Sequence, residues 1–162
     1  MSFLLSTGMM LLIASGAASP GGQSLAKQPF TIVISTENLN VKVGSPVTIK
    51  LELTNTSQQS IDTSANISNQ TGLDPNFNID VHDPSGHPAA KKVPKHPELA
   101  TGRAFLDRLL APGATLTEHF DLSRAYDFSQ PGQYVIEMSR AIPKGLGTGV
   151  VTSNTITVTV TP

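Results

Sequence analysis

The 162-residue chain contains no cysteine and no tryptophan. The absence of cysteine excludes disulfide bonds, thiolate metal ligands and a cysteine nucleophile. It also excludes a lipid-modified cysteine as a membrane anchor. A chain of this length buries about two-thirds of its unfolded surface on folding, so it can hold one core without covalent cross-links. We therefore expect one domain whose packing rests on Val, Ile, Leu, six phenylalanines and two tyrosines.

Charged residues are also scarce. They make up 14% of the chain, and the formal net charge at pH 7 is −1. So small a net charge creates no field that would draw the protein to nucleic acid or to an anionic membrane. We therefore expect no nucleic-acid partner. The composition also lacks the low hydrophobicity and high charge that are typical of a disordered chain.

Residues 1–18 are predicted to be a signal peptide. Phe3 to Ala18 is an apolar stretch ending in small residues, and Gly16 and Ala18 suit the subsites of a signal peptidase. No Lys or Arg precedes the stretch, which leaves open a misassigned start, an uncleaved anchor or a buried strand of a cytosolic protein. We expect an exported protein, periplasmic or secreted, without a stable membrane anchor after cleavage. Residues 19–29 are expected to be a flexible lead-in to a domain over residues 30–162.

From Phe30 onward the dominant hydrophobic period is two. Apolar side chains occupy alternate positions in several short segments, namely Leu39–Val43, Val47–Leu53, Phe77–Val81, Leu116–Leu122, Tyr134–Met138 and Ile156–Val160. This alternation predicts strands with one face on a core and the other in water. Turns rich in Gly and Pro, such as Asp83–Gly86, separate them, and no helix is expected. The pattern predicts an all-β, immunoglobulin-like antiparallel β-sandwich of about seven to nine strands, without a disulfide.

Three of the expected strands carry further predictions. Thr31–Ser35 is expected to lie beside the strand that begins at Val47. Tyr134 follows the Pro131-Gly132 turn, where a tyrosine corner would hold a sandwich through a hydroxyl-to-backbone hydrogen bond. The alternative is that Tyr134 is simply a core aromatic; in either case these three residues are predicted to be structural. The last strand, Thr155–Thr161, could add to a partner's sheet if it lies at an edge.

Two parts of the chain resemble known exported proteins. Residues 41–56, VKVGSPVTIKLELTNT, are similar to the second-strand region of bacterial exported immunoglobulin-like domains. Residues 105–140 resemble the non-catalytic, pro-domain-like N-terminal region of deuterolysin-type (aspzincin) metallopeptidases. The motifs that carry this second resemblance are Leu110–Gly113, Asp121–Ser123, Tyr126–Phe128 and Pro131–Tyr134.

The second resemblance implies a protease-associated role and not a protease. The peptidase needs two histidines one helical turn apart with a glutamate between them, and no His-Glu-x-x-His motif occurs in this chain. The resemblance therefore implies a protease inhibitor or a detached pro-domain-like protein, with a co-exported peptidase as its partner.

The histidines are the weak candidates for metal chemistry. His82, His87 and His96 lie close in sequence beside Asp83, but their spacing matches no known zinc signature. No Gly-x-Ser-x-Gly elbow is present for a Ser-His-Asp triad. Gly145–Gly149 precedes a strand, so it is expected to be a hairpin loop and not a phosphate-binding loop. We therefore expect no enzymatic activity and no cofactor, with a metal-dependent site at the histidines as an alternative.

The segment from His87 to Arg103 is the main candidate for partner recognition. Its basic residues are Lys91, Lys92, Lys95, His96 and Arg103. Its three prolines restrict the unbound chain and lower the entropy lost on docking, and long structureless loops in compact domains are often functional. A solvated, mobile insertion is the alternative, and the polar stretch Thr54–Asp74 is a weaker candidate. We predict a non-catalytic exported module that binds a protein or glycan partner or serves a structural role.

Overall fold

The computed structural model describes residues 28–68, 71–92, 103–106 and 108–162. The predicted signal peptide and most of the predicted lead-in therefore lie outside the described residues. The described part contains twelve strands and one short 3-10 helix. Among the helices of this part, none has the length and apolarity needed to cross a membrane.

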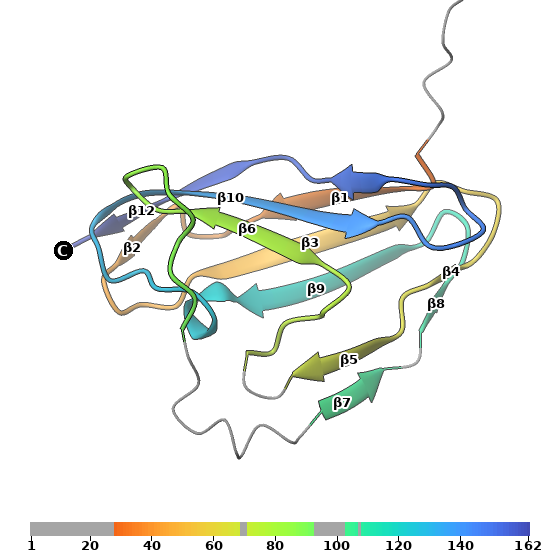
Figure 1. Ribbon diagram of the computed structural model, residues 1–162, viewed down its shortest axis with the longest axis horizontal. Coiled ribbons are helices and arrows are strands. Elements are labelled where there is room, and N and C mark those ends of the chain that lie inside the picture. The colour runs from red at the N-terminus through yellow and green to blue at the C-terminus, as the bar shows by residue number, and fades with distance from the viewer. Residues whose placement is uncertain (1–27, 69–70, 93–102, 107) are drawn as a thin grey trace, which may run out of the picture.

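Eight of the strands form two facing sheets (Figure 1). The first sheet has the order β1-β3-β9, with β1 at Phe30–Ser35, β3 at Thr48–Asn55 and β9 at Thr115–Asp121. The second sheet contains β2 (Asn40–Lys42), β6 (Asn78–His82), β10 (Gly132–Ala141), β11 (Val150–Thr152) and β12 (Ile156–Thr161). Its central strand is β10, because Ile136 has a partner in both β6 and β12, and Ser139 has one in both β6 and β11. The predicted β-sandwich is confirmed.

The core lies between the two sheets, and the alternation in the sequence identifies most of it. Along β3 the apolar residues are buried while their neighbours are partly or fully exposed, and β1 and β10 show the same alternation. The expected pairing of Thr31–Ser35 with the strand after Val47 is confirmed, since β1 pairs with β3 in an antiparallel ladder. The predicted hairpin loop at Gly145–Gly149 is confirmed as well, because it joins the antiparallel strands β10 and β11.

The segment around β2 departs from the prediction in two ways. It pairs with β12 in a parallel ladder, so the sandwich is not wholly antiparallel. Leu39 and Val43 are 55% and 41% exposed, so the alternation in this segment does not place a full row of side chains in the core. The chain leaves the first sheet after β1 and joins the second along β12. Residues 159–161 of β12 therefore already have a neighbour, and the terminal strand is not the free edge that was considered.

Four short strands form two ladders that the alternation did not predict. β4 (Ile61–Asp62) pairs with β8 (Leu109–Leu110), and β5 (Ala65–Ser68) pairs with β7 (Arg103–Leu106). Figure 1 shows them beyond β9, at one flank of the sandwich. Through these two ladders, residues 61–68 of the polar stretch after β3 lie against residues 103–110. Strands of two to four residues are too short to show a clear period of two.

Side chains cover parts of the sheet edges. On β6 the Ile79 carbonyl accepts a hydrogen bond from the Tyr126 hydroxyl at 2.7 Å. On β1 the backbone of Ile34 exchanges two hydrogen bonds, each 2.9 Å long, with the side-chain amide of Asn154. These bonds satisfy edge groups that would otherwise be open to pairing with another chain.

Tyr134 serves both roles considered for it. The residue is 1% exposed, and its hydroxyl donates to the Gln130 carbonyl at 3.0 Å, four residues upstream. Gly132 has φ +139°, and a Cβ at this position would lie 2.6 Å from the ring of Pro84. The Pro131-Gly132 turn therefore packs directly on the turn that follows β6.

Candidate functional site

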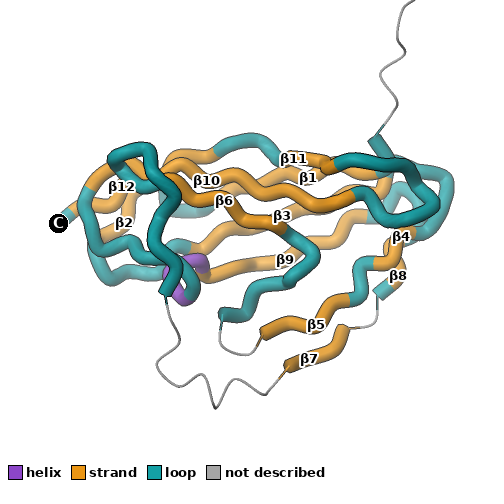
Figure 2. Tube along the Cα trace, in the orientation of Figure 1, coloured by secondary structure: helices purple, strands orange, loops and turns teal. Residues whose placement is uncertain are grey.

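Several loops meet at the end of the sandwich that holds the C-terminus (Figure 2). They are residues 36–39 after β1, residues 43–47 between β2 and β3, residues 83–92 after β6, and residues 122–131 between β9 and β10. The last of these begins with the 3-10 helix η2 (Leu122–Arg124), drawn in purple in Figure 2. We call this set of segments the loop end. Loops held on a rigid sandwich are common positions for recognition residues.

The predicted turn at Asp83–Gly86 is confirmed. The Gly86 amide donates to the Asp83 carbonyl at 2.9 Å. The Asp83 carboxylate accepts from the amides of Ser85 and His87 at 2.8 and 3.0 Å. Gly86 has φ +80°, a conformation that favours glycine. The turn reverses the chain and directs residues 87–89 back along the end of β6.

The segment after this turn is not structureless, and the prediction of a structureless loop is wrong for residues 88–92. Lys92 donates its amide to the Ala125 carbonyl at 2.8 Å, and the Ala90 carbonyl accepts from the Asp127 amide at the same distance. Residues 90–92 therefore lie alongside residues 125–127. No local pattern predicts this pairing, because the two segments are far apart in the chain. Arg103 lies in β7 and not in a loop. Lys95 and His96 lie outside the described residues.

The two described lysines of this segment are held in different ways. The Lys92 ammonium donates to the Ser123 carbonyl, within η2, at 2.7 Å. The Lys91 ammonium lies 6.0 Å from the centre of the Tyr126 ring, within the range of a cation–π contact. Both residues are exposed. The loop end therefore presents two cations from a backbone that is fixed by hydrogen bonds.

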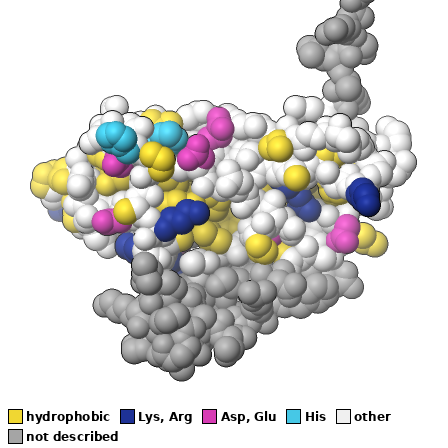
Figure 3. All heavy atoms as spheres, in the orientation of Figure 1, with side chains coloured by type: hydrophobic (Ala, Val, Ile, Leu, Met, Phe, Trp, Pro, Cys, Tyr) yellow, Lys and Arg dark blue, Asp and Glu magenta, His cyan; other side chains and the backbone are white. Residues whose placement is uncertain are grey.

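The described histidines do not form a ligand set for a metal. Both ring nitrogens of His82 have a partner. Its Nε2 lies 3.2 Å from the Asp80 carboxylate, and its Nδ1 lies 3.2 Å from the Gly86 carbonyl oxygen. Within the described ranges, no group of three or more His, Cys, Asp or Glu residues is placed to hold a metal ion. Figure 3 shows histidine side chains next to acidic ones near the β6 end of this face. His96 is outside the described residues.

The titration of His82 gives a first testable prediction. Its pKa is raised above the usual 6.5, first by the hydrogen bond with the Gly86 carbonyl and then by Asp80. A raised pKa in the folded state means that protonated His82 stabilises the fold below the unfolded value, and this contribution is lost as the pH rises through the folded pKa. An NMR titration is expected to place the His82 pKa above 6.5, and Asp80→Asn should lower it. Glu52→Gln, on the other sheet, should leave it unchanged, and an unaltered pKa in the Asp80 variant would contradict this cause.

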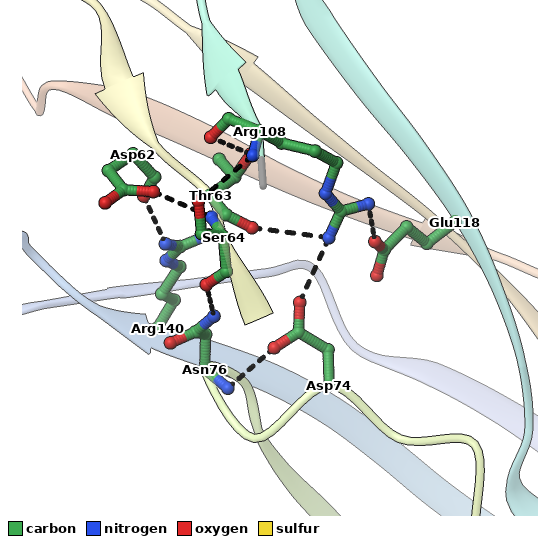
Figure 4. Close-up of polar contacts among 8 residues, drawn as sticks. All are labelled: Asp62, Thr63, Ser64, Asp74, Asn76, Arg108, Glu118 and Arg140. Carbon is green, nitrogen blue, oxygen red and sulfur yellow. Dashed lines mark hydrogen bonds and ion pairs between the residues drawn. The ribbon is translucent and has the colours of Figure 1, made fainter. Parts of the chain in front are cut away.

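A buried polar network lies between the sandwich and the four short strands of the flank (Figure 4). Arg108 is its centre, and its guanidinium is paired with the Glu118 carboxylate. It also lies 3.5 Å from the Asp74 carboxylate and donates to the Thr63 carbonyl at 3.3 Å. The side chains of Asp74 and Glu118 are 0% and 10% exposed. Arg108 therefore links the segment after β5, the flank and strand β9.

Arg140 of β10 is the second arginine of the network. It donates to the Asp62 carbonyl at 2.9 Å, and its guanidinium lies 5.4 Å from the centre of the Phe77 ring. Burial lowers the pKa of Arg140, because a charge in the protein interior loses hydration, while the charge of Asp74 opposes this shift. Three buried atoms of the network have no hydrogen-bond partner: Arg108 Nε, Glu118 Oε2 and Arg140 Nη1.

This network was not predicted from the sequence, although a signal was present. Glu118 lies between Leu116 and Phe120 on the inward side of β9, and Arg140 continues the inward row of β10 after Met138. A charged residue at an inward position of a clear alternation indicates a buried, paired charge, because burial of an unpaired charge is very costly. What the pattern could not show is the partner, which comes from another part of the chain.

The arrangement of the strands defines an immunoglobulin-like β-sandwich. The first sheet follows the order of strands A, B and E of that fold, and β6, β10 and β11/β12 follow strands C, F and G of the other sheet. Tyr134 stands near the start of the F-like strand, where the tyrosine corner of this fold is found. The fold lacks the inter-sheet disulfide of antibody domains, since the chain has no cysteine.

Comparison with known proteins identifies no family. No protein-family model and no curated protein matches the chain. Among solved structures, the CARDB domain of the PF1109 protein from Pyrococcus furiosus, in complex with di-metal ions, has a TM-score of 0.44 at 13% identity, covering 82% of this chain and 87% of that one. A β-glucosidase from Listeria innocua in complex with glucose has a TM-score of 0.44 at 14% identity, covering 81% of this chain but 16% of that one. PapD-like domain 7 of human CEP192 has a TM-score of 0.35 at 16% identity, covering 93% and 94%. At these scores and identities, no ligand or activity transfers to this chain.

Proposed function

We propose that the protein is an exported, non-catalytic binding module that recognises a protein partner through its loop end. The observation that carries this proposal is the backbone pairing of residues 90–92 with residues 125–127, which presents Lys91 and Lys92 from a rigid support. A preformed surface loses little conformational entropy when it binds. Two adjacent cations in a chain of low charge favour an acidic surface as their complement.

Lys91 is the residue whose removal tests the proposal. Its side chain is exposed and its ammonium lies over the Tyr126 ring, so Lys91→Ala should leave the fold intact. The matched control is Lys144→Ala, an exposed lysine in the loop between β10 and β11, outside the loop end. The tagged full chain and both variants would be used to capture partners from exported and envelope fractions of the source cells.

A partner captured by the parent protein and by Lys144→Ala, and bound at least about tenfold more weakly by Lys91→Ala, would support the proposal. Equal capture by all three proteins would place the interface elsewhere. Capture of no protein would leave the predicted glycan partner or a passive structural role.

A protease-associated role stays a second hypothesis, because residues 105–140 resemble a metallopeptidase pro-domain region. The motif residues have structural tasks here: the Asp121 carboxylate accepts from the Ser123 amide at 3.0 Å, and the Phe128 ring centre lies 4.7 Å from that of Tyr134. The needs of the fold therefore account for these residues without a peptidase. This hypothesis would be supported if the captured partners included a peptidase that the chain inhibits or helps to fold.

A further inference from the structure

We propose that a groove on the outer face of the first sheet, formed in part by residues 36–38 and Pro46 of the loop end, binds a single neutral sugar unit of a glycan. The groove has a volume of 260 Å³. It lies where the loop after β1 overhangs the start of β3, and its polar side chains include Ser35, Glu37, Asn38, Lys50 and His119. Its volume is just below the range of about 300–1,000 Å³ that drug-sized ligands occupy, which favours one small unit.

The overhanging loop is held in place by its own hydrogen bonds. The Thr36 hydroxyl donates to the Thr48 carbonyl at 2.9 Å, which fixes the loop to β3. The Thr36 hydroxyl oxygen also accepts from the Asn38 amide at 3.3 Å. The Asn38 backbone is therefore engaged, while its side chain is exposed and lines the groove. The groove exists before any ligand arrives, which lowers the entropy lost on binding.

Strand register places three polar side chains in a row across the floor of the groove. Ser35 of β1 faces Lys50 of β3, and Lys50 faces His119 of β9. Directly opposed residues have Cβ atoms about 5 Å apart, so the three side chains can contact one small ligand together. Their carrier strands, β1, β3 and β9, are the three hydrogen-bonded strands of the first sheet.

The chemistry of the lining favours hydroxyl groups over charged or apolar ligands. Lys50 is already paired with Glu52 at 2.8 Å, and Glu37 adds a negative charge, so the lining has no excess of positive charge for an anion. Val41 and Pro46 are the apolar members of the lining, too small a surface for an apolar ligand. Amide, imidazole, hydroxyl and carboxylate groups together offer both donors and acceptors, and each sugar hydroxyl is itself both.

Two matched pairs of variants test the groove. Asn38→Ala and His119→Ala each remove one exposed side chain of the lining. Asn78→Ala on β6 and His87→Ala in the segment after β6 make the same changes at exposed positions outside the groove lining. The probes are glucose, galactose, mannose and N-acetylglucosamine, added to the isotope-labelled full chain up to about 100 mM, since a small neutral ligand on an open groove binds in the millimolar range.

At least one sugar is expected to shift the backbone amide NMR signals of residues 35–38, Lys50 and His119. Asn38→Ala and His119→Ala should weaken that binding at least about tenfold, and the two control variants should not. The site is overturned if no sugar shifts these signals, or if the lining variants bind as well as the parent. The ligand class is overturned if acetate or methylammonium shifts the same signals and the sugars do not. None of these results depends on Lys91, so the groove and the protein-binding proposal can fail separately.

Discussion

Replacing Arg108 by methionine is expected to lower the free energy of unfolding by about 3–5 kcal/mol. The guanidinium is the partner of Glu118 and a close neighbour of Asp74, and both carboxylates are almost fully buried. Methionine fills much of the same space but leaves two carboxylates in the interior without that cation. A buried charge that loses its partner keeps its full desolvation cost. Urea denaturation, monitored by circular dichroism, measures the loss.

A surface ion pair provides the control for Arg108. Lys50 is paired with Glu52, and both side chains are 40% exposed. Lys50→Met should therefore change the free energy of unfolding by no more than about 1 kcal/mol. Adding Glu118→Gln to Arg108→Met should recover part of the loss, because it removes one of the two unpaired charges. A cost for Arg108→Met no larger than that for Lys50→Met would show that the network does not stabilise the flank.

Asn55→Ala is expected to cost about 2–4 kcal/mol. Asn55 is the last residue of β3 and is fully buried. Its side-chain amide donates to the carbonyls of Gln59 and Leu110 at 2.8 and 2.9 Å, and its oxygen accepts from the Ser57 amide at 2.9 Å. Alanine would leave these groups without their partners and would loosen the connection from β3 to the β4–β8 ladder.

The control for Asn55 is Asn78→Ala, since Asn78 is an exposed asparagine on β6. This substitution should stay within about 0.5 kcal/mol of the parent protein. Equal effects at the two positions would contradict the role of the Asn55 hydrogen bonds. Asn55 also begins an Asn-x-Ser triplet, but its burial and its two donated hydrogen bonds make it a structural residue and not an accessible acceptor for a glycan.

The candidate sites were less predictable than the fold. Lys91 and Lys92 stand out in a chain with few charges, but their pairing with residues 125–127 depends on a contact between distant segments. Ser35, Lys50 and His119 each occupy an ordinary outward position of a strand, and only the order β1-β3-β9 brings them together. His82 and His87 are close in sequence, yet both ring nitrogens of His82 are engaged, one with Asp80 of the same strand and the other with Gly86 of the turn.

The sequence by itself determined the class of the fold and most of the core. Side chains in a strand point alternately to the two faces, so a period of two directly indicates which residues are buried, as in Val47–Leu53. The turn at Asp83–Gly86 could also be predicted from local sequence, because each of its residues has the preference that its position in a type I turn requires. Only the tertiary structure decided the parallel pairing of β2, the flank ladders and the partners of Arg108 and Arg140. The physical reason is that these contacts join segments far apart in the chain, and the free energy that selects them depends on packing and charge pairing between segments that no local pattern records.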